Sequence, residues 1–163
     1  MPDYLQTLIE TPPALTIVPF PDPVVERFGH RPGSPYVELV WLGVLGPSTT
    51  LMWQRLARQA IAMPTSTLDT TDLAVSLGLG ENLGRNSQMS RTLARLVAFD
   101  GGRRQGDMIA VRLALPDLPE RRLSRLSYSA RLAHERFARC GTPARDVAAV
   151  EPSMAEPSMA VAL

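Results

Sequence analysis

The sequence predicts an α+β, mainly helical fold, and three observations support this prediction. Apolar residues recur at helical spacing in three segments between residues 48 and 99. A short segment typical of a strand separates the first two, and a hairpin with its turn at Gly106-Asp107 follows the third. Nine of the 15 prolines lie in residues 1–47, which favours an extended arm because proline interrupts helices.

The chain is predicted to hold one domain of ordinary size with arms on both sides. The arm contains a hydrophobic segment at residues 36–45, predicted to be a strand or an extended core-lining segment because it is rich in β-branched and aromatic side chains. A short strand or helical turn is also expected at residues 4–9. The predicted parts are the N-terminal arm with its hydrophobic lead-in (1–47), the domain (48–115), two C-terminal helices (116–140) and a disordered tail with a tandem repeat (141–163).

Capping residues set the expected bounds of the helices. Ser48 is expected to cap a first helix over residues 49–62, and residues 65–68 form the intervening strand. Asp69 or Thr70 would cap the second helix, which Gly78 closes. Asn86 or Ser87 would cap a third helix that runs to about residue 99. The apolar face expected for this third helix consists of Met89, Leu93, Leu96 and Val97.

Charge is unevenly distributed along the chain. Residues 48–145 carry fifteen arginines against eight acidic residues, a net charge of +7, whereas each flanking part carries −3. All 17 basic residues are arginine. This usage has two readings: a base composition that favours arginine codons, or binding to phosphate, which guanidinium contacts with two parallel hydrogen bonds.

The order of these elements resembles a winged helix-turn-helix domain. The resemblance is carried by residues 73–78, by residues 86–96 and by the hairpin about Gly106, within residues 48–115. In that family an alanine in the second helix, here Ala74, lets the third helix approach closely. The loop at residues 79–85 is longer than the turn of the simplest members. The segment at residues 36–62 also resembles, weakly, the lead-in of bacterial plasmid replication-initiator and regulator domains.

The resemblance implies sequence-specific binding of double-stranded DNA, with the third helix in the major groove and the hairpin on the backbone. Arginine and glutamine can make bidentate contacts with base edges, and serines at a helix start can hold a phosphate. A solvated helix face is the alternative reading for each arginine alone. The DNA-binding residues that the resemblance implies are Ser87, Gln88, Ser90, Arg91 and Arg95 in the helix, with Arg103 and Arg104 in the wing.

Other classes of function find little support in the sequence. No nucleophile, carboxylate pair or phosphate loop stands in a catalytic arrangement, so an enzyme is not expected, and neither is a cofactor. His30, His134 and Cys140 are too few and too scattered for a metal site. Without a secretory signal or an apolar stretch long enough for a membrane span, the protein is predicted to be cytoplasmic.

The expected role is that of a transcriptional regulator, or of an accessory to replication or partition. The alternative, from a different class, is a winged helix that docks a protein partner with its third helix and binds no DNA. A continuous positive surface would favour DNA, and an exposed apolar patch would favour a protein. A homodimer is slightly preferred, paired through the N-terminal segment or the helices after Pro119.

Overall fold

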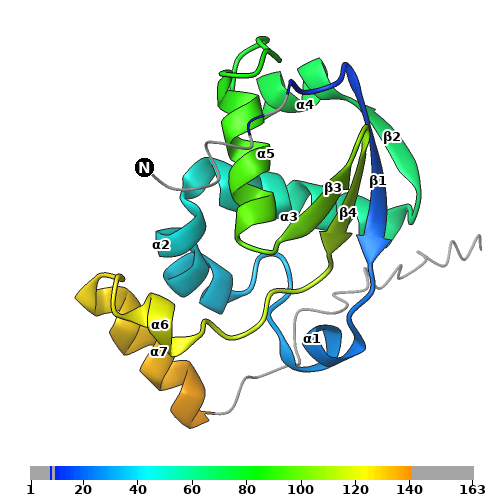
Figure 1. Ribbon diagram of the computed structural model, residues 1–163. Coiled ribbons are helices and arrows are strands. Elements are labelled where there is room, and N and C mark those ends of the chain that lie inside the picture. The colour runs from blue at the N-terminus through cyan, green and yellow to red at the C-terminus, as the bar shows by residue number, and fades with distance from the viewer. Residues whose placement is uncertain (1–7, 9, 141–163) are drawn as a thin grey trace, which may run out of the picture.

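The computed structural model describes Leu8 and residues 10–140, and shows an α+β fold, which confirms the predicted class. A four-stranded sheet contains β1 (Ala14–Phe20), β2 (Ser66–Asp69), β3 (Gly102–Gln105) and β4 (Met108–Arg112) in the order β2-β1-β4-β3. β1 pairs antiparallel with β2 and parallel with β4, and β3 and β4 form an antiparallel hairpin (Figure 1).

β1 corrects the prediction of an irregular arm, because residues 14–20 form an inner strand of the sheet. Leu15 and Ile17 are fully buried, while Ala14, Thr16 and Val18 beside them are not, which is the alternation of a strand. Pro19 had argued against regular structure here. The pairing with β2 ends at Ile17, however, so Pro19 has a partner strand only on the β4 side and its missing N–H breaks no ladder with β2.

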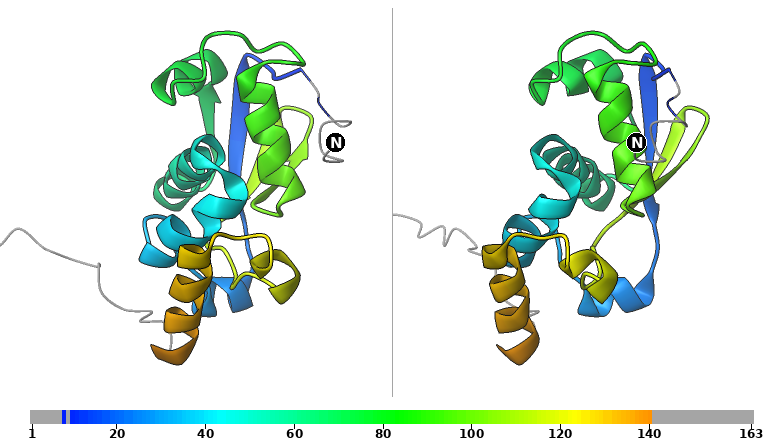
Figure 2. Two further views of the ribbon diagram at one scale, coloured as in Figure 1. Left: turned by 90° about the vertical axis from the view of Figure 1, so that its left-hand side faces the viewer. Right: turned by 60° about the vertical axis from the view of Figure 1, so that its left-hand side comes forward.

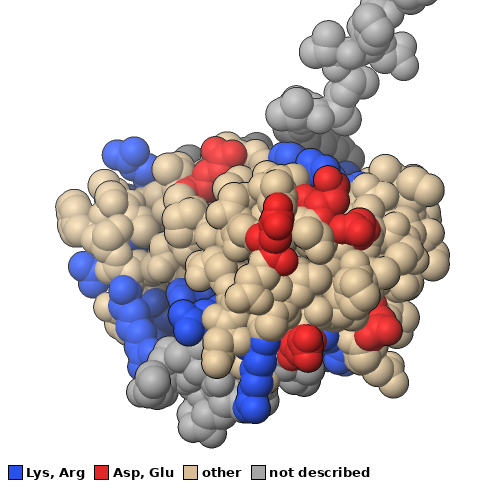
Figure 3. Space-filling view, turned by 90° about the horizontal axis from the view of Figure 1, so that it is seen from above, with Lys and Arg blue, Asp and Glu red and all other residues tan. Residues whose placement is uncertain are grey.

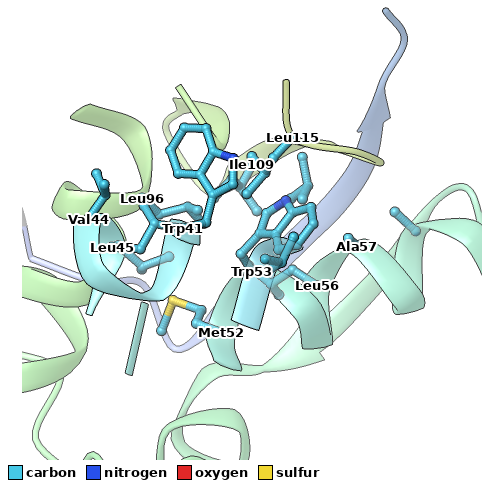
Figure 4. Packing of buried hydrophobic residues seen from close by; sticks show 14 of the residues in the cluster. Trp41, Val44, Leu45, Met52, Trp53, Leu56, Ala57, Leu96, Ile109 and Leu115 are labelled. Atoms are coloured by element: carbon cyan, nitrogen blue, oxygen red, sulfur yellow. The ribbon is translucent and has the colours of Figure 1, made fainter. Parts of the chain in front are cut away.

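Two long helices, α3 (Pro47–Ala62) and α5 (Gln88–Ala98), cover one face of the sheet (Figure 2). Buried side chains of these helices and of the sheet form the core between them (Figure 4). Trp53 of α3 lies within this core, where its indole N–H donates to the Arg112 carbonyl at 2.9 Å. Without such a partner, burial of this N–H would cost on the order of 2–7 kcal/mol.

The hydrophobic segment at residues 36–45 is helical, and the prediction of a strand there is wrong. It forms a π-helical turn η2 (Val37–Trp41) that continues into α2 (Leu42–Leu45). Its buried side chains are Tyr36, Val37, Val40, Trp41, Val44 and Leu45. These positions follow the i, i+3, i+4, i+7 spacing of a helix. The segment lies against the core on one face only, so helical periodicity decided its conformation over β propensity.

The three central helices and the hairpin agree with the predicted order. α4 (Thr70–Ser76) is capped by Asp69, whose carboxylate accepts from the Asp72 N–H at 2.7 Å. Gly78 ends this helix with φ +70°, and Gly106 takes φ +58° in the hairpin turn, a conformation that favours glycine. Val97 is an exception within α5: it was expected in the core but is 36% exposed.

The predicted C-terminal helices are present as α6 (Glu120–Leu123) and α7 (Tyr128–Cys140), and α7 packs against η2 (Figure 1). A further short helix, α1 (Pro23–Phe28), begins at a proline and is capped by Asp22. The strand or turn expected at residues 4–9, Leu8 apart, and the predicted tail lie outside the described residues. No helix in the described part is long and apolar enough to cross a membrane.

Candidate nucleic-acid interface

The N-terminal end of α5 is fixed by a side-chain cap. Ser87 precedes the helix, and its hydroxyl accepts a hydrogen bond from the Ser90 N–H at 3.0 Å. Apolar side chains at Met89, Leu93 and Leu96 then anchor one face of the helix in the core. The opposite side is therefore held at a defined orientation toward the surface.

Three of the predicted residues lie along one side of α5. Gln88, Arg91 and Arg95 are spaced three and four residues apart, and together with Thr92 they line an open hollow of about 370 Å³. The other wall of the hollow is the start of α3 with the residues before it, Leu45 to Thr49. Gln88 and Arg91 are exposed. The hollow thus presents two guanidinium groups and an amide.

Arg95 is the partly buried member of this group. Its Nη2 donates to the Val44 carbonyl at 2.6 Å, and its guanidinium lies 5.4 Å from the centre of the Phe99 ring. These contacts fix its position at the end of α2. Arg95, which the resemblance places near DNA, therefore lines the hollow and also braces α5 against α2.

The two serines of the predicted site are buried. Ser87 is 5% exposed because its hydroxyl turns toward the helix that it caps, and Ser90 is 1% exposed on the inner side of α5. Neither side chain presents a surface to a ligand. Their side chains therefore do not offer to DNA the hydroxyls that the resemblance implies, because the first turn of α5 is packed against the protein.

The two arginines of the hairpin point in different directions. Arg103 pairs with Ala110, whereas Arg104 pairs with the fully buried Ile109, so they lie on opposite faces of the sheet. Arg103 is exposed, and its guanidinium lies 4.5 Å from the centre of the Phe20 ring. The predicted pair is therefore not one patch.

Arg104 is tied to the main chain. Its Nη2 donates to the Glu10 carbonyl at 2.9 Å, and its Nε donates to the Gly106 carbonyl at 3.1 Å. Burial lowers the pKa of the Arg104 guanidinium from its ordinary value, although Asp107 nearby opposes the shift. Its hydrogen bonds serve to hold the N-terminal segment on the hairpin.

Charge on this face of the molecule is segregated in space as well as in sequence. Seen from above, arginines gather on the left-hand side, where Figure 1 draws α2, α6 and α7, and most acidic residues lie to the right of them (Figure 3). No acidic residue is among those that line the hollow. A hollow with arginines and no carboxylate attracts anions.

Sequence reasoning did not identify Ser48 and Thr49 as part of the site. They begin α3 some forty residues before Arg91, and only the packing of α3 on α5 brings them to the hollow. Gly46 precedes them with φ +77°, and no side chain caps α3. The Gly-Pro-Ser-Thr-Thr stretch is typical of a helix start, and this was the sequence signal that could have pointed to Ser48 and Thr49.

The two histidines belong to another part of the molecule. His30 Nε2 lies 2.7 Å from Asp117 Oδ1, and His134 Nδ1 lies 2.7 Å from the Tyr36 hydroxyl. Within residues 10–140 no three metal-ligating side chains come together. These pairs fasten the C-terminal helices to the core.

No family model matches the chain, and neither a curated protein nor a solved structure matches it. The geometry and chemistry of the described residues are thus the basis for a functional proposal.

Proposed function

We propose that the protein binds double-stranded DNA as a winged helix-turn-helix domain, with α5 in the major groove, and acts as a transcriptional regulator. The order α3, β2, α4, α5 and the β3–β4 hairpin supports this reading. It differs from the simplest arrangement because β1 lies between β2 and β4. The hairpin nevertheless follows α5 directly, as a wing follows the reading helix in this family.

The observation that carries the proposal is the side of α5 formed by Gln88, Arg91 and Arg95. The two arginines line the hollow, and no acidic residue is among the described residues that line it. A surface of this kind attracts a polyanion. Glutamine and arginine can also read adenine and guanine edges with paired hydrogen bonds.

The experiment is a binding titration of the full chain on duplexes selected from a random library, at three salt concentrations. About five neutralised phosphates would give a slope of log affinity against log salt of about −4 to −5. Arg91→Ala should weaken binding to the preferred duplex by about 1–3 kcal/mol and relax preference at one base pair. It should leave stability unchanged, because Arg91 is exposed.

The matched control is Arg27→Ala on α1, an exposed arginine at the end of the molecule away from the start of α5 (Figure 1). It removes the same charge, so equal losses from both variants would mean that α5 does not read the sequence. Absence of binding to every duplex would reject the proposal in favour of a winged helix that docks a protein. Arg103→Ala should weaken all duplexes alike, since an arginine on a hairpin meets the backbone.

A further inference from the structure

The hollow between α5 and the start of α3 has features that reading of base edges does not require. It lies at the meeting of two elements, and its α3 wall offers hydroxyls and main chain instead of a surface that could enter a groove. We infer that this hollow is a binding site for one phosphate group, held by Arg95 against Ser48 and the start of α3, with the positive charge of Arg91 beside it. The inference deepens the proposed function and rests on it where the phosphate belongs to the DNA backbone.

Arg95 supplies a cation that is already in place. Its hydrogen bond to the Val44 carbonyl and its contact with Phe99 hold the guanidinium at the wall of the hollow before any ligand arrives. A side chain that is fixed beforehand loses little conformational entropy on binding. Arg91, one turn earlier on the same side, is exposed and adds positive charge beside the ligand, while its base-reading role stays as proposed above. A planar guanidinium donates two parallel hydrogen bonds to phosphate oxygens.

The opposite wall complements these cations. Gly46 occupies the N-cap of α3 and Pro47 its first position, so no side chain caps the first turn. The first N–H groups of a helix lack intrahelical partners, and a helix of 16 residues carries a partial positive charge at this end. Ser48 is half-buried and lines the hollow beside them, whereas the Thr49 side chain is buried. The lining thus combines positive charge and donors with apolar surface from Leu45 and Pro47.

Two sources could supply the phosphate: the DNA backbone, or a free phosphorylated small molecule. A phosphodiester in the hollow would set the register of α5 on the duplex, because backbone contacts position a protein without reading its sequence. A volume of about 370 Å³ would also admit a small phosphorylated compound. Both ligands offer the same phosphate group to the hollow. If the ligand is the DNA backbone, duplex binding depends on the hollow; if it is a free compound, duplex binding does not.

The test is Ser48→Asp in the full chain. A carboxylate at this position puts a negative charge into the hollow, yet it lies in the first turn of α3, where an acidic residue favours the helix. The variant should therefore keep its thermal stability and still bind phosphate more weakly. Val24→Asp is the matched control, since it adds the same charge to the first turn of α1 at an exposed residue.

Two measurements separate the sources. In the first, inorganic phosphate is titrated into the protein and amide chemical shifts are followed. Saturable shifts at Ser48 and Thr49 are expected, with an affinity about tenfold weaker in Ser48→Asp and unchanged in Val24→Asp. In the second, single neutral methylphosphonates are placed along the selected duplex. One position should weaken the parent protein about tenfold and leave Ser48→Asp unaffected, since that variant has already lost the contact.

The outcomes distinguish this inference from the proposed function. If the protein binds duplex DNA, but phosphate causes no saturable shift and no methylphosphonate position depends on Ser48, the phosphate site is refuted and DNA binding stands. If phosphate binds and Ser48→Asp weakens that binding about tenfold, while no duplex binds, the site stands and its ligand is a free phosphorylated compound. In that case only the proposal of DNA binding would be refuted.

Discussion

At the scale of single residues, Tyr36 joins three parts of the chain. Its ring stacks on His30 with centroids 3.7 Å apart, and its hydroxyl accepts from the Leu118 N–H at 2.9 Å. The same hydroxyl lies 2.7 Å from His134 Nδ1, and the tautomer of the imidazole sets which of the two groups donates. Removal of one oxygen atom breaks both bonds.

We therefore expect Tyr36→Phe to lower the free energy of unfolding by about 1–3 kcal/mol, because the Leu118 N–H would remain buried without its partner. Urea denaturation measures this change. Tyr128→Phe removes the same atom from a side chain that is 74% exposed, and it should alter stability by less than about 0.5 kcal/mol. Equal effects from the two variants would show that the buried hydroxyl contributes nothing.

The same residue should make the protein sensitive to alkali. Burial raises the pKa of Tyr36 to about 12, above the value of about 10 for a phenol in an unfolded chain. Because the folded pKa is the higher one, its contribution is complete below about pH 10 and is lost as pH rises toward 12. The expected fall is up to about 1.4 kcal/mol per pH unit. Tyr36→Phe should show a smaller fall over this range.

At the scale of elements, the two helices of the candidate site begin differently. Ser87 caps α5 with a buried hydrogen bond, whereas α3 starts at Gly46 without a side-chain cap, although Ser48 had been expected to provide one. Position explains the difference: Ser48 stands after Pro47, inside the first turn of the helix. A side chain there is too far along the helix to satisfy its first N–H groups.

Ser87→Ala should therefore cost about 0.5–2 kcal/mol of stability, whereas Ser48→Ala should cost close to nothing. Thermal unfolding of both variants beside the parent protein measures the difference. The loss in Ser87→Ala should appear as earlier hydrogen exchange in the first turn of α5, since the cap fixes that turn. A larger effect at Ser48 than at Ser87 would contradict this assignment of the caps.

At the scale of the whole molecule, the C-terminal helices share the core of the sheet and do not form a separate unit. The core extends through Leu118, Leu126 and Ala130. The chain after β4 is tied back to the helices as well, since the Trp41 indole N–H donates to the Pro116 carbonyl at 2.9 Å. A shared core favours cooperative unfolding.

The structure therefore predicts one unfolding transition for the described residues. Tryptophan fluorescence and far-ultraviolet circular dichroism should give the same midpoint in urea. Leu126→Ala, at a buried residue between α6 and α7, should lower both midpoints together, with a loss of about 2–5 kcal/mol. A loss of helical signal before the tryptophan change would mean that the C-terminal helices unfold on their own.

Much of the element order was readable from local sequence. Asp69, Gly78 and Gly106 act through their own backbone conformation or nearest neighbours, so the ends of α4 and the hairpin turn could be predicted. The alternation of Leu15 and Ile17 was also present, but three nearby prolines hid it. Whether a proline breaks a strand depends on which neighbours pair at that position, and those neighbours are 50 to 90 residues away.

The candidate site likewise has features that local sequence determined and features that depend on packing. The sequence by itself determined the α+β class, the capped start of α5 and the side of that helix on which Gln88 and Arg91 lie, because helix periodicity is a local property. Only the tertiary structure decided that Ser90 turns inward, that Arg104 is hydrogen-bonded to main-chain carbonyls and that Ser48 lines the hollow. These outcomes depend on which distant surfaces pack together, and packing depends on the whole chain at once.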